Sequence, residues 1–341
     1  MASTAKTSQA TCELSIVVPL YNEEANVEEL YRRLTATLES LALSYELLFV
    51  DDGSRDSTFS KLLSLRTADP RVGVLRFSRN FGHHLAITAG LQNAAGRYTV
   101  LMDGDLQDRP EDIPALYAKI KEGYQCVFGI RATRHDSPFK RLSSKLFAYL
   151  MNKLVKLDVP LNSCVFRIMD RQFVDAFNQL GERHRFVTGL MSWMGFKQVG
   201  IAVVHDKRFA GQTKYPLLKM LLLALNSVTS FSFRPLQIAS LVGGLTALCS
   251  VLGIVILFYR RLVLGYGVTG WTSVMVTILF LGGVQLIALG VLGEYVGRSY
   301  DEQKARPLYI IDQFYRAEDG LTDRKENHAQ RIHQSALGLA S

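Results

Sequence analysis

The chain has 341 residues, of which 48% are hydrophobic, so it has room for one large globular domain with an appendage. Its formal net charge is +8 at pH 7. Because no DNA- or RNA-binding motif accompanies this charge, we exclude nucleic acid as the partner and expect anionic lipid headgroups or phosphate substrates instead.

Strand-like and helix-like patterns alternate over residues 13–130. Strands are predicted at 14–19, 45–50, 72–77 and 98–102, and helices at 23–41, 57–66 and 82–95. This alternation is typical of an α/β fold, in which a mostly parallel sheet has helices on both faces. Ligands of such folds bind beyond the carboxyl ends of the strands.

Three clusters of polar residues follow predicted strands, at the edge of the sheet formed by the carboxyl ends of the strands. They are Tyr21-Asn22-Glu23, Asp51-Asp52-Gly53 and Asp103-Gly104-Asp105. An isolated pair of acids would also suit a solvated turn, but three polar clusters at one edge of a sheet favour a binding site.

The third cluster predicts a metal site. Residues two apart in an extended segment point the same way, so Asp103, Asp105 and Gln107 can converge on one point. Hard oxygen ligands suit Mg²⁺ or Mn²⁺, which bind through one or two carboxylates together with substrate phosphates.

Two segments are predicted to lie at a membrane surface. Residues 139–157 combine basic side chains with regularly spaced apolar ones, which favours an interface helix, with a solvated helix packed on the domain as the alternative. Residues 216–234 are nearly apolar and favour a juxtamembrane helix, with a third short span as the alternative.

Two uncharged runs follow, at 236–259 and 271–293, and each is long enough to cross a hydrocarbon core of about 30 Å. We predict a two-helix transmembrane hairpin over 235–297, with spans at about 236–259 and 271–295. Glycines in both runs allow close helix contacts, within the hairpin or in a homo-oligomer. Glu294 is costly in lipid, so we expect it at the interface or paired.

The rest of the chain divides into a flexible N-terminus at 1–12, an α/β domain at 13–215 and a C-terminal tail at 298–341. No secretory signal precedes the domain, and the four cysteines have neither metal nor disulfide spacing. We therefore expect an integral membrane protein whose α/β domain and both termini are cytosolic.

A series of motifs runs in order along residues 13–310. They are Ile16–Glu24, Val50–Ser54, Arg79–Gly82, Met102–Gln107, Arg131, Phe166–Arg171, Arg208–Tyr215, Gly293–Arg298 and Arg306–Tyr309. In this series the chain resembles glycosyltransferase family 2, and within it the polyprenyl-phosphate glycosyltransferases, which include bactoprenol glucosyltransferases and dolichol-phosphate mannose synthases. The resemblance implies a GT-A (Rossmann-like) catalytic domain and the inverting transfer of one hexose to a membrane lipid phosphate.

The resemblance also implies roles for individual residues. Glu23 would face the ribose and Asp52 would bind the base. The nucleotide-sugar site would comprise Pro19, Tyr21, Glu23, Val50, Asp52, Asp103, Gly104, Asp105, Gln107 and Arg131, with Asp103, Asp105 and Gln107 at the metal. Arg131, Arg208 and Lys214 would hold phosphate groups and, together with Asp103 and Asp105, would form the catalytic set. Because two phosphates must approach each other, we also expect Arg134, Arg141 and Lys145 to guide the acceptor phosphate.

One segment departs from the family pattern. The acids that often precede the Phe166-Arg167 motif are replaced here by Asn162-Ser163-Cys164-Val165, so we assign no role to that segment. We expect His83 and His84 to pack rather than to bind metal, and His205 and Asp206 to form a hydrogen bond at a strand edge.

The leading hypothesis is transfer of glucose from UDP-glucose to a bactoprenyl-type (undecaprenyl) phosphate, in which the choice of glucose follows from the resemblance alone. A GDP-mannose-dependent mannosyltransferase is the nearest alternative. A processive polysaccharide synthase would carry a Gln-x-x-Arg-Trp motif, which is missing, and a nucleotide-sensing transport component would need polar spans. We further predict that removing residues 236–341 leaves nucleotide-sugar binding intact but removes transfer to long-chain lipid in membranes.

Overall fold

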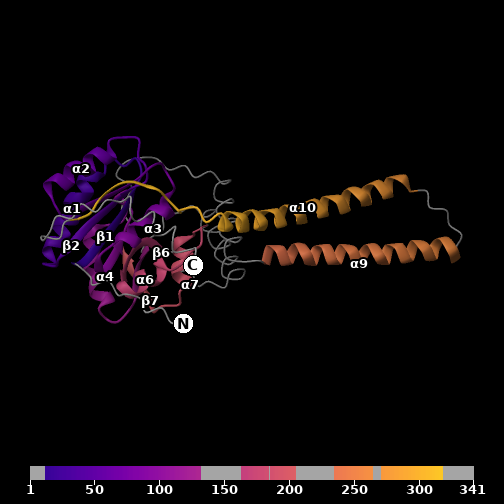
Figure 1. Ribbon diagram of the computed structural model, residues 1–341. Coiled ribbons are helices and arrows are strands. Elements are labelled where there is room, and N and C mark those ends of the chain that lie inside the picture. Colours follow the sequence, from indigo (N-terminus) through magenta and orange to yellow (C-terminus); the bar gives the residue numbers. More distant parts are fainter. Residues whose placement is uncertain (1–11, 132–162, 184, 205–233, 264–269, 318–341) are drawn as a thin grey trace, which may run out of the picture.

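The computed structural model describes residues 12–131, 163–183, 185–204, 234–263 and 270–317 (Figure 1). Within this part of the chain one sheet of eight strands has the order β7-β5-β6-β4-β1-β2-β3-β8. Its strands are β1 Cys12–Leu20, β2 Tyr45–Asp51, β3 Val72–Phe77, β4 Gly96–Leu101, β5 Cys126–Arg131, β6 Ser163–Asp170, β7 Gln198–Val203 and β8 Ile311–Tyr315.

The centre of the sheet is parallel. Strands β4, β1, β2 and β3 run in one direction, with Leu20 of β1 opposite Asp51 of β2. Toward one edge, β6 runs antiparallel to both β4 and β5, and β7 is parallel to β5. The predicted α/β arrangement is confirmed at the centre, and the flanking strands make the sheet mixed.

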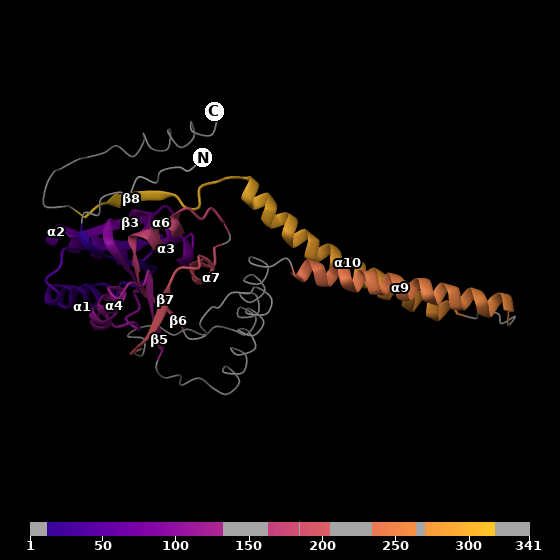
Figure 2. The same ribbon diagram turned by 90° about the horizontal axis from the view of Figure 1, so that it is seen from below.

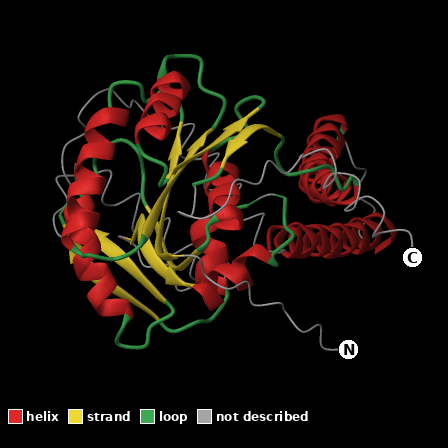
Figure 3. Ribbon diagram, turned by 60° about the vertical axis from the view of Figure 1, so that its left-hand side comes forward, coloured by secondary structure: helices red, strands yellow, loops and turns green. Residues whose placement is uncertain are grey.

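Helices cover both faces of the sheet (Figure 3). The helices of the domain are α1 Val27–Ser40, α2 Thr58–Ala68, α3 His83–Asn93, α4 Ile113–Ile120 after the short 3₁₀ turn η1 Pro110–Asp112, α6 Arg171–Asn178 and α7 Val187–Trp193. On one face α1, α2 and α4 pack on the sheet, and on the other α3, α6 and α7 do.

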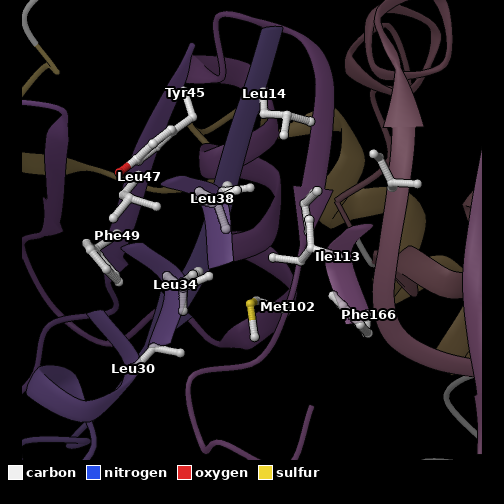
Figure 4. Packing of buried hydrophobic residues seen from close by; sticks show 14 of the residues in the cluster. Leu14, Leu30, Leu34, Leu38, Tyr45, Leu47, Phe49, Met102, Ile113 and Phe166 are labelled. Carbon is white, nitrogen blue, oxygen red and sulfur yellow. The ribbon is translucent and has the colours of Figure 1, made fainter. Parts of the chain in front are cut away.

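Helix α1 illustrates why these segments fold as they do. Val27, Leu30, Leu34 and Leu38 recur at helical spacing and are buried, so they form one apolar face against the sheet. Figure 4 shows the three leucines of this face. Glutamates in the first turn suit the positive end of the helix dipole. Strand β1 is instead buried on both faces, which explains its continuous apolar run.

Strand β8 lies at the edge of the sheet, antiparallel to β3, although it follows the long C-terminal helices in the chain (Figure 2). Residues 311–315 belong to the predicted C-terminal tail, whereas the structure places them in the sheet. The sheet of the domain is therefore completed by a segment that follows β3 by about 230 residues in the chain.

Two long helices extend away from the domain side by side, α9 Arg234–Val263 and α10 Trp271–Gln303 (Figures 1 and 2). Among the described residues only α10, over Ser273–Gln303, is long and apolar enough to span a membrane, with a mean hydropathy of 2.3. The described apolar stretch of α9 is shorter, Ala239–Gly253. The prediction of two transmembrane helices is thus not supported for the first, because its apolar stretch falls short of a bilayer's thickness.

The end of α10 is charged. Glu294 forms an ion pair with Arg298 one turn later, at 2.8 Å, which agrees with the expectation that Glu294 is paired. The predicted helix at 139–157 lies outside the described residues, as do residues 1–11 and 318–341. The predicted helix at 216–234 also lies outside them, except for Arg234, with which α9 begins.

Candidate active site

The three polar clusters meet at one edge of the sheet, as the sequence predicted. The backbone N–H of Asp52 donates to the carbonyl of Leu20 at 2.9 Å, which joins the end of β2 to the end of β1. The N–H of Met102 donates to the carbonyl of Val17 at 3.2 Å, which joins the end of β4 to β1. Each cluster follows directly after one of these strand ends.

The first cluster is held by the loop after β2. The N–H of Asn22 donates to Ser54 Oγ, the N–H of Arg55 donates to Asn22 Oδ1, and the N–H of Glu23 donates to Thr58 Oγ1, each at 2.9 Å. Asn22 adopts a left-handed conformation, with φ 55°, that asparagine tolerates better than most residues. Tyr21 is left with 42% of its surface exposed, so its ring is accessible to a ligand.

Two other members of the predicted nucleoside pocket are less accessible. Pro19 and Val50 are opposite each other in β1 and β2, and both are buried. Glu23 is half-buried, and its Oε2 accepts a hydrogen bond from Asn26 Nδ2 at 2.5 Å. The structure thus gathers Pro19, Tyr21, Glu23 and Val50 at the edge, and their contact with a nucleoside stays a prediction.

Asp52 has a structural partner that the sequence did not indicate. Its carboxylate is 2% exposed and accepts hydrogen bonds from the backbone N–H groups of Phe81 at 2.7 Å and Gly82 at 3.0 Å. Burial raises the pKa of Asp52, while the two N–H donors act in the opposite direction. Asp52 therefore fixes the turn that begins α3, and its predicted contact with a base stays a prediction.

The glycine after Asp52 fits the same turn. Gly53 has φ 69°, and a Cβ built there would lie 2.5 Å from the backbone carbon of Arg79. No other residue type combines that conformation with so close an approach. The motifs Val50–Ser54 and Arg79–Gly82 are therefore two sides of one packed junction.

The acidic cluster lies over the end of β1. A Cβ on Gly104 would lie 2.1 Å from Leu20 Cδ2, so glycine allows the loop to approach this closely. Asp103 and Asp105 are half-buried, and Asp105 Oδ1 accepts the N–H of Gln107 at 3.2 Å. The structure brings Asp103, Gly104, Asp105 and Gln107 together within one short loop.

His83 also contacts this acidic cluster, which its expected packing role did not indicate. Its Nε2 lies 3.4 Å from Asp103 Oδ1. Burial lowers the pKa of His83, and the charge of Asp105 acts in the opposite direction. For His84 the expectation holds, since its ring meets Phe186 edge-on and burial lowers its pKa to about 4.

The acidic loop has the donor set of a divalent cation site. Two carboxylates at a strand end offer hard oxygen ligands, which is what Mg²⁺ and Mn²⁺ take from a protein that also binds a diphosphate. Within the described part of the chain, no three His, Cys, Asp or Glu side chains are arranged as a complete metal site. Asp103 and Asp105 would therefore share the ion with oxygens of the substrate and water.

The predicted basic residues are placed only in part. Arg131 ends β5, opposite Val203 of β7, and β5 runs parallel to β4, so Arg131 lies at the same edge as the acids. Arg134, Arg141, Lys145, Arg208 and Lys214 lie outside the described residues, as do Asn162 and the His205-Asp206 pair. Their roles stay predictions.

Comparison with known proteins places the chain in a family. Residues 15–177 match the model of the family described as glycosyl transferase family 2. The chain is 44% identical to the uncharacterized glycosyltransferase YkcC of Bacillus subtilis, over 90% of this chain and 95% of that protein. It is 39% identical to the prophage bactoprenol glucosyl transferase homolog of Escherichia coli, over 88% and 98% of the two chains.

Two further similarities were found, one to a curated protein and one to a solved structure. The SfII prophage-derived bactoprenol glucosyl transferase of Shigella flexneri is 40% identical, over 89% of this chain and 99% of that protein. Among solved structures, glucosyl-3-phosphoglycerate synthase from Mycobacterium tuberculosis is similar with a TM-score of 0.46 and 18% identity, over 67% of this chain and 82% of that one. On the sequence identities and the family match, this chain belongs to glycosyl transferase family 2.

Proposed function

We propose that this protein transfers a single glucose from UDP-glucose, with inversion, to the phosphate of a membrane polyprenyl (undecaprenyl) phosphate. The observation that carries the proposal is the similarity of about 40% identity to bactoprenol glucosyl transferases over nearly their whole length. The acidic loop, which lies over the end of β1, supports the same reaction class.

The donor would bind across the edge of the sheet. Tyr21 and Glu23 would contact the nucleoside, and the junction held by Asp52 would form the floor of its pocket. Asp103 and Asp105 would hold Mg²⁺ or Mn²⁺ against the diphosphate, where the ion supplies Lewis-acid stabilisation of the leaving group. The Arg131 position, at the same edge, would add a cation where negative charge develops.

The acceptor needs little activation. A lipid phosphate monoester has a second pKa of about 6 and is already anionic at neutral pH. Its oxygen can attack the anomeric carbon from the side opposite the diphosphate, which inverts the configuration. The protein's task is then to overcome repulsion between two phosphates, the role predicted for Arg208 and Lys214 with Arg134, Arg141 and Lys145.

The helical appendage would hold this site at the bilayer. Its side chains are unusually apolar for an exposed surface, with Leu248, Leu252, Leu286 and Ile287 each more than half exposed. A lipid environment around α10, and around the part of α9 that packs along it, would cover these side chains. The catalytic domain and both termini would be cytosolic.

Transfer of radiolabel to extracted lipid tests the proposal. Full-length protein in membranes would receive undecaprenyl phosphate and either labelled UDP-glucose or labelled GDP-mannose, with Mn²⁺, with Mg²⁺ or with EDTA. We expect a single-sugar lipid product from UDP-glucose that disappears with EDTA, and its anomeric configuration by NMR opposite to that of the donor. Label from GDP-mannose alone would identify a mannosyltransferase, and nucleotide binding without lipid product would contradict the proposal.

Asp105→Ala provides the matching variant. We expect its turnover to fall by on the order of 10²–10³ or more, because a main contact to the leaving diphosphate is lost, while the thermal unfolding profile stays that of the wild type. Asp312→Ala, on the exposed face of β8, is the control and should retain full turnover.

A further inference from the structure

Arg167 is a buried arginine that the proposed mechanism does not use. It is 3% exposed and lies inside β6, opposite Leu101 of β4 on one side and Phe128 of β5 on the other. Arginine is among the residues least often buried, because moving its charge out of water costs several kcal/mol unless partners compensate.

The hydrogen-bond partners of this guanidinium are neutral. Nη2 donates to the carbonyl of Cys164 at 2.9 Å, Nε donates to the carbonyl of Val165 at 3.0 Å, and Nη1 lies 3.0 Å from the sulfur of Met191. In the described part of the chain no carboxylate lies within ion-pair distance of it. These contacts fix the orientation of the guanidinium but leave its charge without a direct counter-ion.

The side chain extends toward the acidic loop. Strands β4 and β6 are antiparallel, so Val165 and Cys164 lie at the end of β6 that adjoins the end of β4. Two residues beyond Leu101 in that direction, the chain reaches Asp103. The guanidinium donates hydrogen bonds to the carbonyls of Cys164 and Val165, so it points toward the end of β4 that Asp103 follows.

Arg167 and Asp103 also share a face of the sheet. Leu101 packs in the cluster formed by α3, α6 and α7, and Arg167 contacts Met191 of the same cluster. Asp103, two residues after Leu101, meets His83 at the start of α3 on that face. No strand therefore separates the guanidinium from the carboxylate.

Electrostatics agree with this placement. Burial lowers the pKa of Arg167, and Cys126, Cys164 and Asp103 act in the opposite direction. Burial also raises the pKa of Cys126 to about 12, so that thiol is uncharged at pH 7. Asp103 is the carboxylate of this set, and the guanidinium keeps its proton at any physiological pH.

We infer that Arg167 is a positioning residue of the donor site proposed above, whose buried charge behind Asp103 makes the acidic loop selective for a divalent cation bound together with a nucleoside diphosphate over the free cation. A free cation carries two positive charges, whereas its complex with UDP is neutral or anionic. A fixed positive charge nearby weakens binding of the first and strengthens binding of the second.

Loss of the Arg167 charge should change the Mn²⁺ affinity and the UDP affinity in opposite directions. Neutralising Arg167 should tighten binding of Mn²⁺ to the nucleotide-free protein and weaken binding of UDP at saturating Mn²⁺. Structural damage at the same position would weaken both. The sign of the Mn²⁺ effect therefore distinguishes an electrostatic role from a packing role.

Arg167→Gln is the principal variant, because the amide can still donate to a neighbouring carbonyl while the charge is lost. In the full-length protein in detergent, Mn²⁺ affinity would be measured by EPR of the unbound ion and UDP affinity by calorimetry. We expect Mn²⁺ to bind roughly three- to tenfold more tightly and UDP to bind weaker by a similar factor. Arg167→Lys, which keeps the charge, should stay within about twofold of the wild type in both.

Arg171→Gln is the matched control. It removes the same charge from a residue four positions away. Arg171 pairs with Asp175 at 2.8 Å and lies near the start of β4, at the end of the strand away from the acidic loop. Both affinities should remain at wild-type values, since the contacts that this variant loses, to Asp175 and to the carbonyl of Ala94, lie away from the acidic loop.

Weaker or unchanged Mn²⁺ binding in folded Arg167→Gln would overturn the inference. If Arg167→Gln did not fold, Arg167→Lys would decide: wild-type affinities would support a role of the charge, and altered affinities would contradict it. If the wild type bound Mn²⁺ but not UDP, the proposed donor would be wrong, and the Mn²⁺ titration would still test Arg167 by itself.

Discussion

The ring of Tyr309 stacks on the ring of Phe77, with their centroids 4.8 Å apart and their planes inclined by 23°. Tyr309 lies between α10 and β8, and Phe77 ends β3. Phe81 meets Phe77 edge-on at 5.6 Å, and the N–H of Phe81 donates to Asp52. A continuous set of contacts thus joins the segment that follows α10 to the second polar cluster of the site.

Replacing Tyr309 should weaken both the fold and the site. Tyr309→Ala removes the stacked ring and its hydrogen bond to Gln92, so we expect the free energy of unfolding to fall by about 2–3 kcal/mol. UDP affinity should fall as well, because Phe81 loses the support of its neighbour. Thermal unfolding and calorimetry of the full-length protein measure both, and Tyr315→Ala on β8, which is 37% exposed, should change neither by much. Wild-type UDP affinity in a destabilised Tyr309→Ala would contradict the link.

The packing of the segment after α10 on β3 was not predictable from the sequence. The central strands β1, β2 and β4 and the polar cluster after each were predictable, because periodicity and turn residues are local signals. Strand β8 was not, since its five residues gain their place only by pairing with β3 across the whole length of the helical appendage. Removing residues 236–341 would also remove Tyr309 and β8, which pack on the domain. The structure therefore gives a reason to expect weaker nucleotide binding after this truncation, contrary to the prediction from the sequence.

Within the site, the residues themselves were easier to predict than their partners. Asp103, Asp105 and Gln107 were found from alternation along one segment. The contact of His83 with Asp103 and that of Asp52 with Phe81 join segments that no pattern in the sequence connects. Arg167 was visible only as part of a motif, because burial of a charge is a property of the folded chain.

The phenol of Tyr309 should make stability depend on alkaline pH. Burial raises the pKa of Tyr309 to about 12, whereas an unfolded tyrosine titrates near 10. The folded state then holds its proton over an interval in which the unfolded state releases it, so the stabilisation is complete below about pH 10 and is lost as the pH rises toward 12. Tyr309→Phe has no such group. The stability advantage of the wild type over Tyr309→Phe, measured by thermal unfolding, should shrink as the pH rises from about 10 to about 12. A difference that stays constant over this range would refute this cause.

Asp52 is expected to act on the turn before α3. Asp52→Ala leaves the N–H groups of Phe81 and Gly82 without their acceptor, at a cost of about 1–3 kcal/mol. Hydrogen exchange at these two amides should become roughly ten- to hundredfold faster, and UDP should bind more weakly. Asp52→Asn keeps one acceptor oxygen, so its exchange rates and its UDP affinity should lie between those of the wild type and those of Asp52→Ala. Asp175→Ala, in an ion pair remote from the site, is the control. Unchanged exchange at Phe81 and Gly82 in Asp52→Ala would show that the turn does not depend on this carboxylate.

Close approach of the acidic loop to β1 should be essential to the geometry of the site. A Cβ on Gly104 would lie 2.1 Å from Leu20 Cδ2, and Leu20 is 2% exposed, so Gly104→Ala must push either the loop or the leucine aside. We expect a loss of about 1–3 kcal/mol in stability together with a fall in turnover, because Asp103 and Asp105 flank the displaced residue. Gly181→Ala, where an added Cβ meets open space, should behave as the wild type.

A double-mutant cycle separates this clash from other effects of alanine. Leu20→Ala alone leaves a cavity and should cost about 2–5 kcal/mol, but it also removes the atom that Gly104→Ala would strike. The added cost of Gly104→Ala should therefore be much smaller in the Leu20→Ala background, and turnover relative to that background should recover. Additive losses of stability and turnover in the double variant would mean that the loop at Gly104 is constrained by something other than Leu20.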